Sequence, residues 1–456
     1  MQKRIVLHNS DNIILTDDQT QSLEIISLWY KTKDLFLCLN GSAGTGKTTL
    51  AKYFIQREIS SSVKCCVSAP THQAKEVISK KTGLQGFTVH KLLGIRMDLD
   101  IADFDPDNPV YDVKGVGELF KFDIVILDEA SMINTKLYNH LLKKCKKENV
   151  KILFLGDELQ LNPVGEKVSP VFKENDVTTL TEIVRQVGDN PLLDIFTVLR
   201  NDIENNTENY LKLLTESKTT NSGGYKIYPI SNAVKKKEFA STCVEHFNDP
   251  LNNNKILTWT RKNVDSWNVA VKGKVNPSET VVTIGDTIVG ATNIYKNNEL
   301  ILTNSSSYRI INAVDHVRRV VGITVHSLRV TCVNAYLDRP VQFNIVKPES
   351  YGVYTSILLD KKDKAKRQGK RGWVNYYNFK ADFLIADDLI TSHGNVVDTR
   401  SFTLGYSSTV HKSQGSTYEN TFVIASNIRK NRDIAERNRL MYVALSRTSK
   451  TSHIYI

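Results

Sequence analysis

The chain has 456 residues, of which 41% are apolar and 24% are charged, and its formal net charge at pH 7 is +11. This length exceeds one ordinary hydrophobic core and predicts two to four domains, and the apolar content excludes a low-complexity chain. The positive charge favours a polyanionic partner such as nucleic acid, although a basic surface kept for solubility explains it equally well.

Six cysteines are spread along the chain without a C-x-x-C pair: Cys38, Cys65, Cys66, Cys145, Cys243 and Cys332. This pattern indicates neither a zinc framework nor a disulfide scaffold, so we expect reduced core thiols in a cytosolic-type compartment. No apolar run follows the first four residues, and none approaches about 18 residues. We therefore expect neither a signal peptide nor a membrane span.

The first part of the chain alternates short apolar runs with helical patterns. Apolar runs at residues 35–39, 65–67, 124–127 and 152–155 predict buried strands, and residues 73–80 and 136–144 between them predict helices. This succession indicates an α/β fold with a parallel sheet. Ligands of such a sheet bind at the carboxyl ends of its strands.

One segment near residues 95–118 breaks this succession. Apolar and polar residues alternate over 97–101 and again over 111–113, and residues 105–109 (D-P-D-N-P) are a strong turn signal. The pattern predicts a β-hairpin inserted into the α/β unit. The alternative is an ordinary surface loop without a hairpin.

A second α/β unit begins near residues 255–260 and resumes near 421–425. Between them, about 285–400 contains many short β-like runs and predicts an inserted β-rich domain. A basic run at 361–371 is followed by Trp373, Tyr376, Tyr377 and Phe379. Basic and aromatic residues together suit a nucleic-acid strand, and a solvated charged loop beside an ordinary core is the alternative. No internal repeat is evident.

Residues 41–48 (G-S-A-G-T-G-K-T) fit the P-loop pattern between a predicted strand and a predicted helix. The glycines let the backbone approach phosphate oxygens, and the helix N-terminus directs free N–H groups at them. Lys47 would reach the β- and γ-phosphates, and Thr48 would ligate Mg²⁺. The expected nucleotide-binding residues are Gly41, Ser42, Ala43, Gly44, Thr45, Gly46, Lys47, Thr48 and Thr49.

Five further residues suit phosphoryl transfer. Asp128 and Glu129 end a buried apolar run, where Asp128 would hold Mg²⁺ and Glu129 would act as general base toward water. Gln160 follows the next strand and has the chemistry to sense a γ-phosphate. Arg185 and Arg447 would supply positive charge against that phosphate, although a surface salt bridge is the default fate of an arginine.

Taken together, these segments resemble the ordered motifs of superfamily 1 helicases. The matching segments are residues 15–19, 41–48, 69–74, 88–92, 128–129, 156–164, 180–186, 406–416 and 439–448. The motif sequences A-P-T-H, T-V-H-K and T-V-H-K-S-Q-G resemble those of the RecD-like and Dda-like branch. The resemblance implies two RecA-like P-loop motor domains with an inserted β-hairpin and an inserted small β-rich, SH3-like domain.

The resemblance also implies domain limits and residue roles. Motor domain 1 would be residues 1–190, motor domain 2 would be 191–284 with 401–456, and the β-rich insertion would be 285–400. Gln19 would read adenine and Gly415 would lie near the same cleft. Nucleic-acid contacts would come from Pro70, Thr71, His72, Thr88, His90, Thr409 and His411. Phe104 or Tyr111 would form a wedge at the hairpin.

From this resemblance we expect an ATP- and Mg²⁺-dependent DNA helicase that moves 5′ to 3′ in replication or recombination. Its partners would be single-stranded and forked DNA, with a single-strand-binding protein or replication proteins. It would be a cytoplasmic monomer with no membrane partner, in the host cytoplasm if the source is a phage. The alternatives are an RNA helicase or RNP remodeller of the same superfamily, and a P-loop ATPase or translocase that does not unwind.

Overall fold

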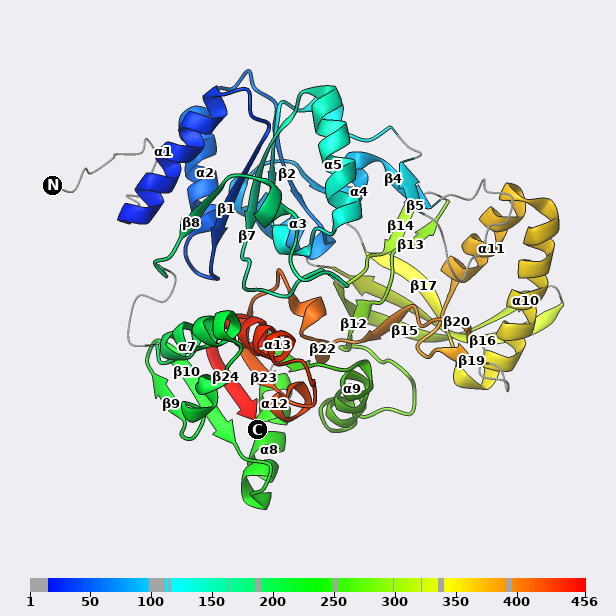
Figure 1. Ribbon diagram of the computed structural model, residues 1–456. Helices are drawn as coiled ribbons and strands as arrows, with labels where there is room; N and C mark the ends of the chain where they lie inside the picture. The colour runs from blue at the N-terminus through cyan, green and yellow to red at the C-terminus, as the bar shows by residue number, and fades with distance from the viewer. Residues whose placement is uncertain are drawn as a thin grey trace.

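The computed structural model describes residues 15–97, 111–113, 116–163, 165–184, 190–248, 253–297, 299–320, 322–334, 340–390 and 396–456. Within these residues the strands form three six-stranded sheets and three two-stranded pairs. Figure 1 shows one body around each large sheet. We call them the first α/β body (residues 17–180), the second α/β body (192–275 and 407–455) and the third body (287–404).

The first α/β body contains a parallel sheet in the strand order β3-β2-β6-β7-β1-β8. The strands are β1 (Phe36–Gly41), β2 (Cys65–Ala69), β3 (Gly86–Thr88), β6 (Ile124–Leu127), β7 (Lys151–Gly156) and β8 (Val177–Leu180). The helices are α1 (Asp17–Lys31), α2 (Lys47–Glu58), α3 (His72–Thr82), α4 (Val89–Leu93), α5 (Thr135–Glu148) and α6 (Val171–Glu174). The parallel α/β organisation expected from the sequence is therefore present.

Helices cover both faces of this sheet, because successive strand residues point to opposite sides. In β1, Leu37 and Leu39 pack with α1, α2 and α3, whereas Cys38 packs with α4 and α5. All four residues of β6 are buried, which explains why its sequence is a continuous apolar run. Ligands can reach this sheet at its edges and ends, where the motif residues follow the strands.

The second α/β body repeats this design with the strand order β22-β11-β23-β24-β10-β9, and only β9 runs antiparallel to its described neighbour. The strands are β9 (Lys218–Thr220), β10 (Gly223–Tyr228), β11 (Asn254–Thr258), β22 (Ser407–Thr409), β23 (Tyr418–Val423) and β24 (Thr448–Tyr455). The helices are α7 (Leu192–Asn205), α8 (Ala233–Asn248), α9 (Arg261–Val275), α12 (Ala425–Ile428) and α13 (Ile434–Ser446). Residues from α7, α12 and α13 pack on one face, and residues from α8 and α9 pack on the other.

The third body lies in the chain between β11 and β22. Its sheet has the order β18-β17-β16-β15-β12-β21. The strands are β12 (Thr287–Gly290), β15 (Ser307–Val320), β16 (Ile323–Val333), β17 (Val341–Val346), β18 (Phe383–Leu384) and β21 (Phe402–Leu404), with the pairs β13 (Ile294–Lys296)/β14 (Glu299–Leu302) and β19 (Leu389–Ile390)/β20 (Val396–Asp398) beside it. Helices α10 (Tyr351–Gln368) and α11 (Lys370–Asp382) form an antiparallel-looking pair at one side of it (Figure 1).

For the basic and aromatic segment, the helical pair agrees with the alternative of an ordinary core beside charged residues, and not with rings that stack on bases. The basic run crosses the turn between α10 and α11, and Trp373, Tyr376 and Phe379 are 3%, 2% and 6% exposed. These rings fill the core between the helices and the sheet, so they are not available to stack on bases. The spacing of 373, 376 and 379 is helical, and this periodicity was the signal that pointed to core residues.

Short 3₁₀ turns lie between the larger elements of the described residues. They are Leu119–Lys121, Ala130–Met132, Asn209–Lys212, Pro348–Ser350 and His411–Ser413. In the predicted hairpin, β4 (Ile95–Met97) and β5 (Tyr111–Val113) pair antiparallel. Phe104 and the predicted turn lie outside the described residues, and so does the side chain of Tyr111. Among the described helices, none has the length and apolar character needed to cross a membrane.

Candidate nucleotide site and nucleic-acid interface

The P-loop connects β1 to α2 at the carboxyl end of the first sheet. Gly44 and Gly46 adopt φ values of 93° and 85°, a left-handed conformation that favours glycine. Thr45 Oγ1 donates to the Ser42 carbonyl at 3.0 Å, which closes the loop on itself. Lys47 Nζ donates to the carbonyls of Gly41 and Ser42, the latter at 3.0 Å, so its ammonium group lies inside the loop. The loop can therefore cradle an anionic group.

Gln19 is attached to this loop from α1. Its side chain is 5% exposed, and Nε2 donates to the Thr45 carbonyl at 2.9 Å. Its Oε1 accepts from the Thr16 backbone N–H at 3.1 Å, as part of the capping box that begins α1. A Cβ on Gly46 would lie 2.6 Å from Gln19 Nε2. The structure thus places Gln19 against the P-loop, and its contact with adenine stays a prediction.

Asp128 and Glu129 follow β6 directly. The Asp128 backbone N–H donates to the Ser68 carbonyl at 2.9 Å, and Asp128 Oδ1 accepts from the Glu129 N–H at 2.9 Å. Glu129 has φ 56° and ψ 43°, a left-handed conformation that is strained for a residue with a side chain. Burial and the neighbouring Asp128 carboxylate raise the pKa of Glu129, which suits a proton acceptor.

The segment after β7 brings Asp157 and Gln160 to the same edge of the sheet. Both are almost fully buried. Asp157 Oδ1 accepts from the Leu159 N–H at 3.1 Å, and Gln160 Nε2 lies 3.5 Å from Asp157 Oδ2. Gln160 Oε1 is buried, and none of the described residues gives it a hydrogen bond. A buried acceptor normally has a protein, water or ligand partner, so this oxygen marks a polar position in the site.

The second α/β body contributes Arg447 and Gly415 to this site. Arg447 is 5% exposed and follows the end of α13. Its positive charge partly offsets the upward shift in the pKa of Glu129 that burial and Asp128 cause. A Cβ on Gly415 would lie 3.6 Å from Glu129 Oε1 and 3.0 Å from the Ala74 Cβ. Gly415 has φ 77°, so the chain turns tightly where it passes over Glu129. The two bodies therefore meet across the P-loop and the carboxylate pair.

The donor set fits a nucleoside triphosphate with Mg²⁺. Lys47 and Arg447 supply positive charge, the P-loop supplies backbone N–H groups, and Thr48 and Asp128 supply the hard oxygen ligands that Mg²⁺ prefers. The buried Gln160 Oε1 adds a polar position to the site. Arg185 lies outside the described residues, so its place beside this site stays a prediction.

The predicted nucleic-acid contacts follow strand ends at the same side of both sheets. Thr71 Oγ1 accepts from the Ala74 N–H at 3.2 Å and thereby begins α3, directly after β2. Pro70 and His72 flank this residue, and His90 lies one strand away on α4. Burial, together with Lys75, Lys91 and His90, lowers the pKa of His72 to about 4.

Two of these contacts occupy equivalent places in the two sheets. Thr88 ends the edge strand β3 and its Oγ1 accepts from the Lys91 N–H at 3.3 Å; Thr409 ends the edge strand β22 and its Oγ1 accepts from the Lys412 N–H at 3.3 Å. Residues 88–91 and 409–412 share the sequence T-V-H-K. The repeated T-V-H-K string was visible in the sequence, whereas the structure shows that both copies end an edge strand and form the same cap.

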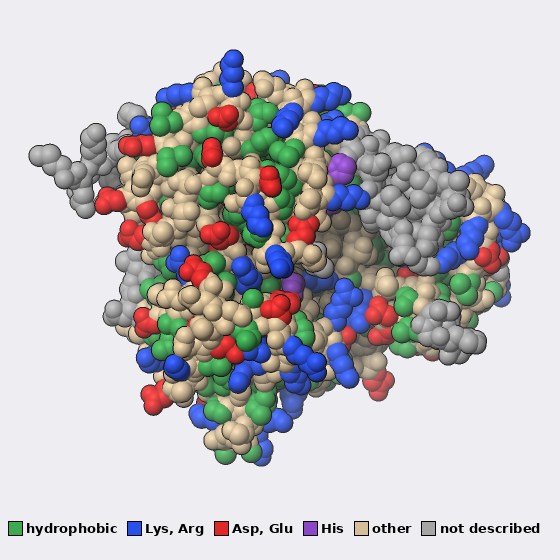
Figure 2. Space-filling view, viewed as in Figure 1, with side chains coloured by type: hydrophobic (Ala, Val, Ile, Leu, Met, Phe, Trp, Pro, Cys, Tyr) green, Lys and Arg blue, Asp and Glu red, His purple; other side chains and the backbone are tan. Residues whose placement is uncertain are grey.

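His411 lies beside the same turn. Its Nε2 is 3.8 Å from Glu436 Oε1, and burial lowers its pKa. Figure 2 shows Lys and Arg side chains, together with histidine, along the boundary of the two α/β bodies. The contact between Gly415 and Ala74 joins the β22 turn to the first turn of α3 across this boundary. The segment after β22, which carries His411, therefore meets the start of α3, which carries His72, at this boundary.

Sequence reasoning did not identify Asp157, Arg439 and Tyr442. Arg439 Nη1 donates to the Gln160 carbonyl at 2.7 Å, and Tyr442 OH donates to Asp157 Oδ2 at 2.8 Å. Arg439 and Tyr442 lie on α13, eight and five residues before Arg447. The two are three residues apart and so lie on one face of a motif-bearing helix, which was the available signal.

Comparisons with known proteins agree with this arrangement. A family model described as an AAA domain matches residues 15–216, and one described as a UvrD-like helicase C-terminal domain matches residues 404–455. The chain is 26% identical over 466 residues to the ATP-dependent DNA helicase dda of Enterobacteria phage T4, with 95% of this chain and 97% of that protein covered. It is 23% identical over 471 residues to the RecBCD enzyme subunit RecD of Buchnera aphidicola, with 91% and 69% covered.

Among solved structures, the chain resembles a Bacteroides Pif1 helicase in complex with ADP-AlF3 and ssDNA. The TM-score is 0.50 at 18% sequence identity, and the alignment covers 97% of this chain and 92% of that chain. At this level of identity the similarity shows a shared fold, which is the fold of a helicase with RecA-like bodies.

Proposed function

This chain is a superfamily 1 helicase of the RecD-like and Dda-like branch, and from that premise we propose that it is an ATP-dependent DNA helicase that translocates 5′ to 3′. One observation carries the proposal. Glu129 of the first α/β body lies next to Gly415 and within the electrostatic reach of Arg447 from the second α/β body. A nucleotide bound to the P-loop would thus contact both bodies, and its hydrolysis would change how they fit together.

In this mechanism the chain's own residues position the phosphates and the water. The P-loop backbone and Lys47 bind the phosphate oxygens, and Arg447 approaches the γ-phosphate from the other body. Glu129 accepts the proton of the attacking water, and Gln160 Oε1 orients that water. Mg²⁺, held by Thr48 and Asp128, would neutralise charge on the phosphate oxygens.

The DNA strand is proposed to cross both bodies along the capped turns. Thr71 and Thr88 would hold it on the first body, and Thr409 would hold it on the second. Opening and closing of the boundary would then change the distance between the DNA-binding threonines of the two bodies and move the strand. The 5′ to 3′ direction is supported by the resemblance to the RecD-like and Dda-like branch.

The domain limits are part of this proposal. Three separate six-stranded sheets support a three-part division close to 1–190, 191–284 with 401–456, and the insertion 285–400. Strand β21 (Phe402–Leu404) pairs with β12 in the third sheet, so we place the end of the insertion at about 404. The antiparallel pairing of β4 with β5 supports a hairpin near 95–118. We propose that this hairpin carries the wedge, with Phe104 or Tyr111 at the duplex end. We also propose that the chain acts as a cytoplasmic monomer together with replication proteins.

The test is unwinding of two duplexes, one with only a 5′ single-stranded tail and one with only a 3′ tail, in the presence of ATP and Mg²⁺. We expect separation of the 5′-tailed duplex alone. Separation of the 3′-tailed duplex alone would retain a helicase and overturn the direction. ATPase activity stimulated by DNA without separation of either duplex would overturn unwinding, and stronger stimulation by RNA than by DNA would overturn the substrate.

The charges near α3 predict that replacing His72 and replacing Lys91 affect the salt dependence of DNA binding differently. Because the pKa of His72 is lowered to about 4, its imidazole is neutral at pH 7.5, whereas Lys91 on α4 is an exposed cation. We expect His72→Asn to weaken binding of single-stranded DNA a few-fold without changing the slope of log K against log salt. Lys91→Gln should reduce the magnitude of that slope by about 0.7.

Fluorescence anisotropy with a labelled oligonucleotide at four or more salt concentrations measures both slopes. Lys80→Gln, an exposed lysine at the far end of α3, is the matched control and should leave the slope unchanged. A reduced slope for His72→Asn would contradict a neutral imidazole, and an unchanged slope for Lys91→Gln would remove Lys91 from the strand path.

A further inference from the structure

Helix α13 faces both α/β bodies. Toward its own body, Met441 and Leu445 are fully buried in a hydrophobic cluster with α7. Asn438 Nδ2 donates to the Asp202 and Thr207 carbonyls, at 3.2 and 2.6 Å. These contacts attach α13 to the second body. A contact between its other face and the first body therefore depends on how the two bodies are positioned relative to each other.

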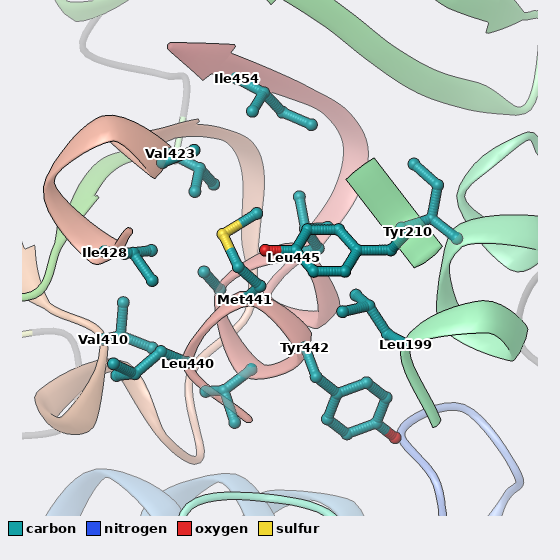
Figure 3. Close-up of a cluster of buried hydrophobic side chains, with 14 of the residues drawn as sticks. Leu199, Tyr210, Val410, Val423, Ile428, Leu440, Met441, Tyr442, Leu445 and Ile454 are labelled. Atoms are coloured by element: carbon teal, nitrogen blue, oxygen red, sulfur yellow. The ribbon is translucent and has the colours of Figure 1, made fainter. Parts of the chain in front are cut away.

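The other face of α13 reaches the first body through Arg439 and Tyr442. Figure 3 shows the Tyr442 ring leaving the hydrophobic cluster toward a blue loop of the first body, whereas Tyr210 points into the cluster. Tyr442 OH donates to Asp157 Oδ2 at 2.8 Å, and the hydroxyl lies near enough to Ser42 and Ala43 of the P-loop for both to influence its pKa. One buried hydroxyl therefore contacts the segment after β7 and lies beside the P-loop.

Asp157 links Tyr442 to Gln160. Its Oδ2 accepts from Tyr442 OH and lies 3.5 Å from Gln160 Nε2. Arg439 Nη1 holds the same segment by donating to the carbonyls of Glu158 and Gln160. Leu159 and Leu161 of this segment pack into the hydrophobic cluster of α7 and α13. The segment 157–161 is thus attached to α13 by polar and apolar contacts together.

From these contacts we infer that Tyr442 is a positioning residue for ATP hydrolysis. It links the position of α13 beside the P-loop to the positions of Gln160 and Arg447. This inference rests on the proposed function and extends it. Arg447 caps the same helix, so a shift of α13 away from Asp157 also moves its guanidinium away from the nucleotide. Tyr442 itself does not touch the reacting atoms; it acts through Gln160 and Arg447.

The experiment uses the full chain and replaces only the hydroxyl, by Tyr442→Phe. Tyr210→Phe is the matched control, because Tyr210 is buried in the same cluster and none of the described residues forms a hydrogen bond with its hydroxyl. Steady-state ATPase is measured with and without saturating single-stranded DNA, together with the melting temperature. We expect Tyr442→Phe to lower kcat about tenfold, as for loss of a hydrogen bond to a charged acceptor. The KM for ATP should change less than about twofold, since the P-loop is intact.

A double-mutant cycle with Arg447→Ala separates coupling from packing. If Tyr442 acts by placing Arg447, then Tyr442→Phe should lower kcat much less in the Arg447→Ala background than in the wild type. Equal losses in both backgrounds would overturn the inference. It would also be overturned by wild-type kcat in Tyr442→Phe, or by a fall in melting temperature that Tyr210→Phe does not show and that accounts for the lost activity.

The proposed function and this inference fail in different ways. If the wild-type ATPase is not stimulated by DNA, the helicase proposal is overturned, while the cycle still reports on Tyr442 through the basal rate. If the wild-type chain unwinds DNA and Tyr442→Phe hydrolyses ATP as fast, only the inference is overturned.

Discussion

Lys47→Ala is expected to abolish ATP-driven unwinding and to lower the ATPase kcat about 10²–10³-fold. The ammonium group lies inside the P-loop, against the carbonyls of Gly41 and Ser42, where it would meet the β- and γ-phosphates. Alanine removes the charge that stabilises the transition state, and no other described lysine is placed in this loop. Steady-state ATPase with saturating single-stranded DNA measures the loss.

Lys52→Ala provides the control for Lys47→Ala, because Lys52 lies on the same helix α2 outside the phosphate loop. It should retain wild-type hydrolysis and unwinding. Circular dichroism must show that both variants fold. A Lys47→Ala protein that folds and keeps more than about a tenth of the wild-type kcat would place the phosphates elsewhere.

Glu129→Gln is expected to lower kcat about 10²–10⁴-fold while ATP binding is retained. The amide preserves the shape of the side chain but cannot accept the proton of the attacking water. A fluorescent ATP analogue should therefore bind with near wild-type affinity, and single-turnover hydrolysis should be lost. Glu174→Gln, at an exposed glutamate on α6, is the control and should be fully active.

The same variant has an expected effect on stability in the absence of metal. Burial and Asp128 raise the pKa of Glu129 in the folded state, so the wild-type carboxyl contributes stability at low pH and loses it as the pH rises. The melting temperature of Glu129→Gln relative to wild type should therefore rise between about pH 4.5 and about pH 7, the ordinary and the raised pKa, and then level off. A constant difference across this range would contradict the raised pKa, and unchanged kcat would exclude Glu129 as the base.

The sequence by itself determined those parts of the protein that depend on neighbouring residues. The strands that precede the P-loop and the Asp128–Glu129 pair lie where they were predicted, because a buried parallel strand needs a specific local pattern, and the roles of the loop and the pair stay predictions. The threonine caps at residues 71, 88 and 409 are local in the same sense: each side chain bonds a backbone N–H three residues later.

The helical pair α10–α11 shows where local pattern was misleading. Its basic run and aromatic residues indicated a nucleic-acid contact, yet the rings of Trp373 and Tyr376 are buried against the third sheet. Composition does not specify which side of a helix meets the core, and only the helical spacing of the rings carried that information.

Only the tertiary structure decided which residues meet across the two α/β bodies. Asp157 and Tyr442 are 285 positions apart in the chain, and Gly415 approaches Glu129 from a different sheet. No periodicity relates such residues, because their contact depends on how two separately folded sheets pack and not on the geometry of one helix or strand. The sequence therefore predicted the phosphate loop and its carboxylates, and the packing of α13 against them determined how the second body reaches the nucleotide site.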